Sequence, residues 1–366
     1  MSWLLDQRLV TLFGSVLAIG GAGCAAVDPN EPPAATDAPS LHLEAEPGVL
    51  PLYGLGRSRQ GGCEQADFRR FDFWIGQWNV FAAGAPDPAG TNVVTRTLDG
   101  CAIEERWTDA AGGRGRSLNT FDRGTGRWNQ LWMDFNGLAL ILTGTASSGA
   151  MTLLGDTPKG IGGPIITNRI TWTAMGRDRV RQFWDVSEDG RQTWATAFDG
   201  DYQRARRVKA AAETVNPFCA SRPRYHWFDF VIGDWTVSEA SAPARPLGRL
   251  QVAKDVSDCL VEWRFKGRGH EGKAFAAFHF PTLTWHRTWI DEDGVRIALT
   301  GTQVGAGMVM TGTRVVAGSS QNLRASWTPV SADVVEEIWE TSADGGATWA
   351  PARHFLLTRR ASEVVQ

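Results

Sequence analysis

The chain carries the same long pattern twice. The segment FDFWIGQWNV at residues 71–80 returns as FDFVIGDWTV at residues 228–237. Later blocks follow in the same order, at an offset that stays between 155 and 158 residues: CAIEER with CLVEWR, WxxxWxD and LTGT in both copies, and SEDGRQTW with SADGGATW. A repeat of this length is a duplicated domain rather than a solenoid unit, and 366 residues leave room for two domains of moderate size.

Each copy has the composition and spacing of an all-β domain. The chain contains 17 Trp, 41 Gly and only 3 Tyr, and short β-forming runs alternate with turn residues. In the first copy we expect strands at residues 93–98, 102–108, 128–134, 138–145, 166–173 and 180–186. The sequence therefore predicts two tandem antiparallel lipocalin-like β-barrels of about 8–10 strands each, because closure removes exposed edges. A β-sandwich is the alternative fold.

The N-terminus predicts export. Residues 9–23 form an apolar run that is too short to span a bilayer as an ordinary helix. It ends in Gly21-Ala22-Gly23-Cys24, which resembles a bacterial lipobox in which Cys24 becomes lipidated; ordinary cleavage near Ala25-Ala26 is the alternative. We expect a lipoprotein of the cell envelope, on the periplasmic face of a membrane and in contact with that membrane only through its lipid anchor.

The repeats divide the rest of the chain. The expected parts are a signal peptide at 1–26, a disordered Pro/Ala-rich tether at 27–62, a first barrel at 63–206, a linker at 207–218 and a second barrel at 219–362.

Four cysteines remain once Cys24 is assigned to lipid, two in each copy. We expect the disulfides Cys63–Cys101 and Cys219–Cys259, each worth about 4 kcal/mol in the chain-entropy model, because exported proteins rarely keep free thiols. Four buried thiols are the alternative. The sequence contains no C-x-x-C motif, so the spacing of the cysteines does not suggest a zinc site.

Strand alternation gives one candidate pocket in each copy. Trp128, Gln130, Trp132 and Asp134 share a face in the first copy, and Trp285, Trp289 and Asp291 share the matching face in the second. If that face points inward, it lines a small-molecule pocket with aromatic rings and a carboxylate. Alternatively the rings merely fill the barrel and Asp134 caps a turn.

A second set of candidates is also held in both copies. Glu104 and Arg106 share one face, as do Glu262 and Arg264, and such pairs inside a barrel could hold a polar ligand group. They could equally be solvated surface pairs. Trp184 and Trp339 lie two residues after Gln182 and Glu337, and these four residues are further candidates for the interior.

Other functional classes are less well supported. The net charge is −3, without the clustered Lys and Arg of a nucleic-acid surface. None of the 6 His lies in the first barrel, so a histidine-based site common to both copies is excluded, and we expect no metal and no cofactor. The preferred hypothesis is a binding protein for a small apolar or aromatic ligand. The alternatives are a hydrolase that uses Glu104 and Asp134 on a sugar or ester, and a structural protein with Trp-filled barrels.

Two resemblances sharpen these expectations. Gly76-x-Trp78 and Gly233-x-Trp235 resemble the G-x-W that opens lipocalin-like (calycin) barrels, which place an arginine of the last strand on that tryptophan. The resemblance implies that Arg204 stacks on Trp78 and that Arg359 stacks on Trp235. The FDFWxGxW opening also resembles a family of exported bacterial proteins of unknown function. The second copy departs from its pattern at Val231, Leu260 and Phe265, so its pocket is expected to differ or to be filled.

The SxDxGxTW pattern that ends the second copy resembles the Asp box of sialidases. That motif is a structural hairpin tip in sialidases as well, so it is weak evidence for carbohydrate chemistry here.

Overall fold

The computed structural model describes residues 50–55, 62–316 and 319–361. The expected signal peptide and the lipidation site at Cys24 fall outside these residues. Within the described part of the chain, no helix is long and apolar enough to cross a membrane.

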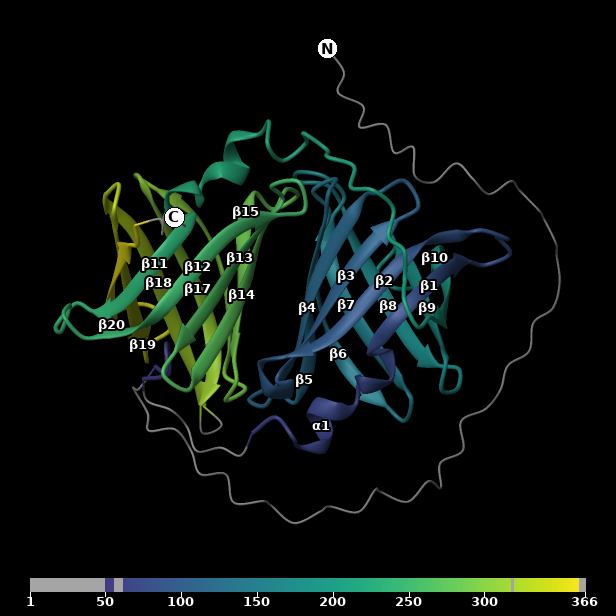
Figure 1. Ribbon diagram of the computed structural model, residues 1–366, viewed down its shortest axis with the longest axis horizontal. Coiled ribbons are helices and arrows are strands. Elements are labelled where there is room, and N and C mark those ends of the chain that lie inside the picture. Colours follow the sequence, from purple (N-terminus) through teal and green to yellow (C-terminus); the bar gives the residue numbers. More distant parts are fainter. Residues whose placement is uncertain (1–49, 56–61, 317–318, 362–366) are drawn as a thin grey trace, which may run out of the picture. The chain divides into compact units, whose positions relative to one another are not determined.

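The first copy forms a closed antiparallel barrel of ten strands, in which β1 pairs with both β2 and β10 (Figure 1). Each remaining strand pairs with its neighbours in sequence, as in a simple meander. The strands are β1 (Gly76–Ala82), β2 (Pro88–Thr97), β3 (Ala102–Asp109), β4 (Arg114–Asp122), β5 (Arg127–Asp134), β6 (Ala139–Ser147), β7 (Ala150–Pro158), β8 (Ile165–Ala174), β9 (Arg179–Ser187) and β10 (Ala195–Arg204).

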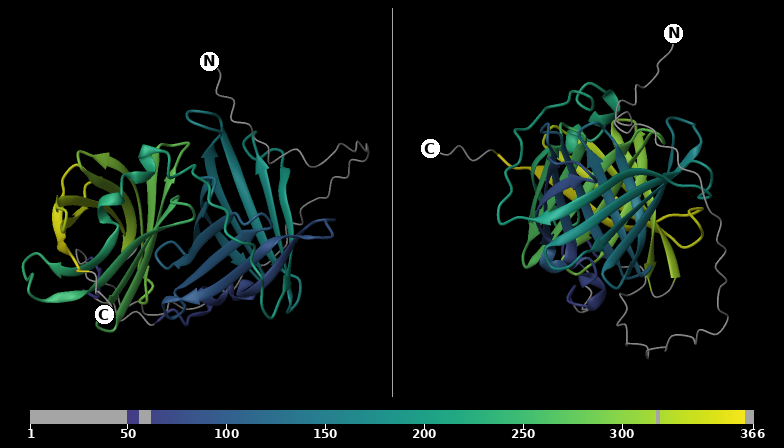
Figure 2. Two further views of the ribbon diagram at one scale, coloured as in Figure 1. Left: turned by 45° about the horizontal axis from the view of Figure 1, so that its top comes forward. Right: turned by 90° about the vertical axis from the view of Figure 1, so that its right-hand side faces the viewer.

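The second copy repeats this topology, with β11 closing on β20. The left-hand view of Figure 2 shows how each set of strands curves round into a barrel. The strands are β11 (Gly233–Glu239), β12 (Pro246–Asp255), β13 (Leu260–Gly267), β14 (His270–His279), β15 (Thr284–Asp291), β16 (Arg296–Val304), β17 (Gly307–Val316), β18 (Ser319–Ser331), β19 (Val334–Ser342) and β20 (Ala350–Arg359). The predicted pair of antiparallel barrels is confirmed, and the sandwich alternative is wrong.

The helices of the described residues are single turns that lie outside the barrel walls. They are α1 (Ala66–Arg69), η1 (Asp72–Trp74), η2 (Leu98–Gly100), η3 (Pro223–His226) and η4 (Asp229–Val231). The turns η1 and η4 come directly before β1 and β11, so they carry the repeated aromatic opening of each copy across one end of its barrel.

That end of the first barrel is closed by stacked aromatic rings and an arginine. Phe71 stacks on Trp74 with ring centroids 4.8 Å apart, and the Trp78 indole nitrogen donates a hydrogen bond to the Trp74 carbonyl oxygen at 2.9 Å. The Arg204 guanidinium lies 4.2 Å from the centroid of the Trp78 ring, in the arrangement that the G-x-W resemblance implied. A Cβ on Gly76 would lie 2.3 Å from Arg204 Nη1, so the glycine of this motif makes room for the arginine.

The second barrel is closed in the same way. The Trp235 indole nitrogen donates to the Val231 carbonyl oxygen at 2.8 Å, and Arg359 lies 4.1 Å from the Trp235 ring centroid. A Cβ on Gly233 would lie 2.2 Å from Arg359 Nη1. The closed ends of the two copies therefore share one construction.

Both predicted disulfides are present. Cys63 is bonded to Cys101, and Cys219 is bonded to Cys259. Each bond ties the segment before a barrel to the start of its third strand, β3 or β13.

One part of the expected disordered tether is instead built into the fold. Leu50, Leu52 and Tyr53 are no more than 3% exposed, and they pack into the second barrel rather than the first. In Figure 1 this short purple segment lies beside β19, which comes from the other end of the chain.

Candidate functional site

The strand β5 points its predicted face into the first barrel. Trp128 and Trp132 lie opposite Phe121 and Ser117 of the neighbouring strand β4. Gln130 lies between the two tryptophans on the same face. The Gln130 amide donates to Asn119 Oδ1 at 2.8 Å inside the barrel, which fixes the direction of this face. In the second barrel Trp285, Arg287 and Trp289 take the matching inward positions on β15.

A layer of polar side chains crosses the middle of the first barrel, and its centre is Glu105. Glu105 Oε1 accepts a hydrogen bond from Asn92 at 2.7 Å, and Oε2 accepts one from the Ser117 hydroxyl at 2.7 Å. Burial raises the pKa of this carboxyl to about 7, against the lowering effect of these two hydrogen bonds. The other members of the layer are Asn119, Gln130, Gln182 and Tyr202.

Beyond this layer, toward the end away from Arg204, the inner wall is aromatic and partly exposed. Its four rings are Trp107, Trp132, Trp184 and Phe198. The Trp184 indole nitrogen donates to Asn168 Oδ1 at 3.1 Å, so this ring is held on the wall. Because these inward rings remain partly exposed, solvent reaches the interior at this end.

Three of these rings lie against glycines of the wall. A Cβ on Gly115 would lie 2.3 Å from the Trp132 ring. The corresponding distances are 2.7 Å from Gly90 to Trp107 and 2.4 Å from Gly200 to Phe198. Each ring occupies the space that a side chain on the wall would fill, so it lines the barrel rather than crossing it.

The carboxylate at the end of β5 has a structural role. Asp134 Oδ1 accepts hydrogen bonds from the backbone amides of Asn136 at 2.9 Å and Leu138 at 2.8 Å, and burial raises its pKa to about 6. Asp291 Oδ1 binds the amides of Asp293 and Val295 in the same way. The Oδ1 atom of this aspartate therefore caps a turn in both copies, as the alternative interpretation of Asp134 stated.

The second barrel has a different interior. The position of Glu105 is taken by Trp263, and the position of Gln130 is taken by Arg287, which is 1% exposed. The Arg287 guanidinium lies 5.1–5.6 Å from the ring centroids of Trp263, Trp289 and Trp327. Phe265, Trp289 and Trp339, which match the partly exposed Trp107, Trp132 and Trp184, are all buried.

Tyr53 accounts for the burial of two of those rings, Phe265 and Trp289. Its ring centroid lies 4.7 Å from that of Phe265, 5.5 Å from that of Trp289 and 4.9 Å from that of Phe355. Its hydroxyl donates a hydrogen bond to Glu337 Oε2 at 2.9 Å. Glu337 matches Gln182 of the first barrel and is completely buried, and burial raises its pKa.

A tight turn carries Tyr53 into the barrel. Tyr53 and Gly54 have φ of +51° and +80°, and the Leu55 amide donates to the Leu52 carbonyl oxygen at 2.9 Å. Arg353, on the inward face of β20, donates to the carbonyl oxygen of Leu50 at 3.0 Å. We call residues 50–55 the plug segment.

The predicted interior role of Glu104, Arg106, Glu262 and Arg264 is wrong. Glu105 points inward, so strand alternation turns Glu104 and Arg106 to the outside of the barrel wall. Trp263 points inward in the second copy, and Glu262 and Arg264 lie outside in the same way.

These outward carboxylates join the two copies. Arg116 of β4 pairs with Glu104 of its own barrel and with Glu262 of the other barrel, at 2.5 Å and 3.0 Å. Lys273 takes the matching position on β14 and pairs with the same two carboxylates. Burial raises the pKa of Glu262, but hydrogen bonds from Arg116 and Arg264 outweigh it and lower that pKa to about 2. The positions that persist in both copies hold the barrels to each other.

This placement contradicts the carboxylate-pair hydrolase. That hypothesis requires Glu104 and Asp134 to meet in one cavity, whereas Glu104 lies outside the wall and is paired with Arg116 and Lys273.

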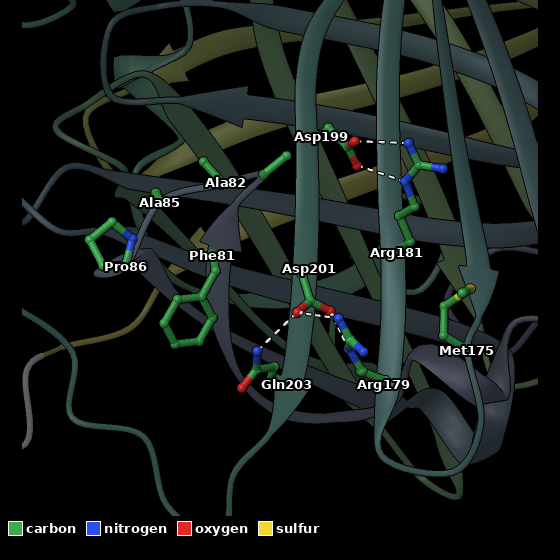
Figure 3. Close-up of a pocket in the computed structure, with 12 residues that line it drawn as sticks. Phe81, Ala82, Ala85, Pro86, Met175, Arg179, Arg181, Asp199, Asp201 and Gln203 are labelled. Atoms are coloured by element: carbon green, nitrogen blue, oxygen red, sulfur yellow. Dashed lines mark hydrogen bonds and ion pairs between the residues drawn. The ribbon is translucent and has the colours of Figure 1, made fainter.

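Two hollows on the outside of the barrels take no part in this site. One, of about 500 Å³, lies between the β1–β2 hairpin and the outer face of β9 and β10 (Figure 3). Its charged side chains are already paired, Arg179 with Asp201 at 2.8 Å and Arg181 with Asp199 at 2.7 Å. The other, of about 380 Å³, is lined by residues of both barrels, among them Ile141 and Thr300.

Comparison with known proteins gives little beyond this geometry. The sequence matches no family profile and no curated protein. Among solved structures, a protein of unknown function of the DUF3598 family from Nostoc punctiforme is 10% identical, with 81% of this chain and 100% of that chain covered and a TM-score of 0.18. A triple arginine-to-alanine variant of AofleA from Arthrobotrys oligospora is 8% identical, with 78% and 91% covered and a TM-score of 0.16. Scores this low carry no argument about function.

Proposed function

We propose that the first barrel binds a small aromatic molecule with one polar substituent, and that Tyr53 takes the place of such a molecule in the second barrel. The observation that carries the proposal is the contact set of Tyr53. Its ring lies among aromatic side chains of the second barrel wall, and its hydroxyl donates to Glu337, which matches Gln182 of the polar layer in the first barrel.

The first barrel offers the same kinds of contact without a plug segment among its described residues. Trp107 and Trp132 match Phe265 and Trp289, and both remain partly exposed on the inner wall. Gln182 matches Glu337, and Glu105, Asn92 and Tyr202 supply further polar atoms at the same depth. A bound ring would contact the indoles, and its polar substituent would reach this layer.

The cell envelope is the proposed setting. The apolar run at residues 9–23 and the cysteine that follows it support export and lipid anchoring at Cys24. The two disulfides support an oxidising compartment such as the periplasm. If Cys24 carries the lipid, Cys24→Ser should move the protein from the membrane fraction to the soluble fraction. Unchanged fractionation would contradict the anchor and leave the binding proposal standing.

Calorimetric titration with p-cresol, the side-chain analogue of tyrosine, tests the binding proposal. We expect a dissociation constant of roughly 10 µM to 1 mM, which suits so small a ligand. 4-Methylcyclohexanol has a similar size but no aromatic ring, and it should bind about 10-fold more weakly or not at all.

The duplication supplies a matched control for this titration. Trp132→Ala should weaken p-cresol binding about 10-fold, whereas Trp289→Ala, at the same position of the plugged barrel, should leave binding to the first barrel unchanged. Near-ultraviolet circular dichroism would establish that both variants keep their tertiary structure. Equal effects of the two substitutions, or no binding of any aromatic compound to the unaltered chain, would contradict the proposal.

A further inference from the structure

The second barrel contains a buried histidine beside a group of carboxylates. His270 is the first residue of β14, Asp291 is the last residue of β15, and Asp293 follows in the next turn. The ring and carboxylate atoms that these three residues offer lie within 4.8 Å of one another. We propose that they bind a divalent transition-metal ion of the zinc class.

Two of these residues, His270 and Asp291, have buried polar atoms without a hydrogen-bond partner in the part of the chain that the structure describes. His270 is 3% exposed and neither of its ring nitrogens has a hydrogen-bond partner among the described residues. Asp291 is 1% exposed; its Oδ1 accepts hydrogen bonds from the turn amides, while its Oδ2 has no hydrogen-bond partner within the described ranges. Leaving such buried polar groups without a partner costs free energy. A bound cation would give a partner to one ring nitrogen of His270 and to Asp291 Oδ2.

The separations suit metal ligands better than hydrogen bonds. His270 Nε2 lies 3.6 Å from Asp291 Oδ2, and Nδ1 lies 3.7 Å from Asp293 Oδ2. These distances are too long for hydrogen bonds. Two atoms that each lie about 2.1 Å from a tetrahedral zinc ion are about 3.4 Å apart. One ion would use a single ring nitrogen of His270, and the three ligand atoms then lie within 4.8 Å of one another, so the side chains would move closer to complete the coordination. One imidazole nitrogen with two carboxylate oxygens is a donor set that zinc accepts.

The surrounding charge also favours a cation. Glu292 Oε1 lies 3.7 Å from His270 Nδ1, which brings a third carboxylate to the group. One cation near the group among the described residues is Arg123, whose Nη1 donates to the backbone carbonyl oxygen of Asp293 at 2.7 Å. Among the described residues, three carboxylates therefore lie near this point, and Arg123 also interacts electrostatically with two of them, Asp291 and Asp293.

The site belongs to the second copy alone. The position of His270 is Gly113 in the first copy, which agrees with the absence of histidine from that barrel. His270 also lies against the plug segment, because a Cβ on Gly54 would be 3.2 Å from His270 Cβ. A metal held here would therefore fix the edge of the second barrel that the plug segment crosses.

Zinc titration of the chelator-treated, untagged full chain tests the inference, with a chromophoric zinc indicator as competitor. We expect one high-affinity zinc ion per chain. His270→Gln and Asp291→Asn should each weaken binding at least about 10-fold, and Asn at 291 keeps the Oδ1 atom that caps the turn. The control is His286→Gln, which alters a histidine outside the proposed site that lies beside His279, and it should leave the affinity unchanged.

Cobalt provides a second measurement. Co²⁺ bound to His270 should give a visible d–d absorption band that His270→Gln removes. The inference is overturned if no zinc binds, if zinc binding persists in both His270→Gln and Asp291→Asn, or if His286→Gln abolishes it. Binding of Ca²⁺ alone, without sensitivity to His270, would overturn it as well.

Discussion

Tyr53 and Glu337 are separated by 284 residues in sequence, yet the Tyr53 hydroxyl donates a hydrogen bond to Glu337 Oε2 at 2.9 Å in the interior of the second barrel. The contact makes a segment that precedes the first barrel part of the second one. Burial, followed by the nearby Glu337 carboxylate, raises the pKa of the Tyr53 phenol well above its usual range, so the hydroxyl stays a hydrogen-bond donor.

Removal of the Tyr53 ring should destabilise the chain and open the second barrel. Tyr53→Ala leaves a cavity among Phe265, Trp289 and Phe355, and we expect the free energy of unfolding to fall by about 3–5 kcal/mol. Urea denaturation measures the change. Tyr53→Phe keeps the ring and loses only the hydrogen bond to Glu337, so its cost should be smaller, about 1–3 kcal/mol. Equal stabilities of Tyr53→Ala and the unaltered chain would show that the plug segment does not stabilise the barrel.

Glu105 should make stability fall as pH rises toward neutrality. Its pKa in the folded protein is about 7, against 4.5 for an ordinary glutamate, so folding favours the protonated form. The stabilising contribution is present in full below pH 4.5 and is lost as pH rises through 7. A shift of this size is worth about 3 kcal/mol.

Glu105→Gln isolates that effect, because glutamine has a similar shape and does not titrate. The Ser117 hydroxyl can reverse its role and accept a hydrogen bond from the new amide. The difference in unfolding free energy between the two proteins, followed from pH 4 to 8, should change by about 3 kcal/mol. A constant difference across this range would mean that Glu105 has an ordinary pKa.

Arg116 should contribute strongly to the stability of the chain through its ion pairs between the barrels. Arg116→Ala leaves Glu104 and Glu262 with Lys273 as their buried cation, and we expect a loss of about 3–5 kcal/mol in unfolding free energy. Arg106 also pairs with Glu104 but is 52% exposed, so Arg106→Ala should cost only about 0–1 kcal/mol. Thermal unfolding compares the two variants, and similar losses would contradict this account.

The disulfides should contribute similar amounts to each barrel. Cys63–Cys101 and Cys219–Cys259 have sequence separations of 38 and 40 residues, so removal of either should cost about 4 kcal/mol in the chain-entropy model. Denaturation of Cys63→Ala/Cys101→Ala and of Cys219→Ala/Cys259→Ala measures these costs. A loss below about 1 kcal/mol in both would contradict the estimate.

Features that depend on local pattern were predictable from the sequence. Strand alternation placed Trp128 and Trp132 on one shared face, which the structure turns inward, and the duplicated register predicted two barrels and two disulfides. The stacking of Arg204 on Trp78 followed from a motif whose glycine is required by close packing. The strands β1, β4, β7 and β10 lay outside the expected ranges. In β4 the inner face carries Ser117 and Asn119, so the usual apolar alternation is missing.

The middle layer and the plug segment were not predictable in this way. Comparison of the copies selected Glu104 and Glu262 because both are retained, but they are retained for contact between the barrels. Glu105 became Trp263 in the second copy, so the same comparison passed over it. Tyr53 lies in a proline-rich stretch that resembles a linker, and its role depends on contacts made hundreds of residues later.

The number of p-cresol sites tests the central claim most directly, and equilibrium dialysis at saturating p-cresol measures it. The account predicts one site per chain in the unaltered protein, because Tyr53 already fills the second barrel, and two sites per chain in Tyr53→Ala. No site in the unaltered protein would contradict binding by the first barrel. An unchanged count in a folded Tyr53→Ala variant would contradict the role of Tyr53 as a built-in ligand.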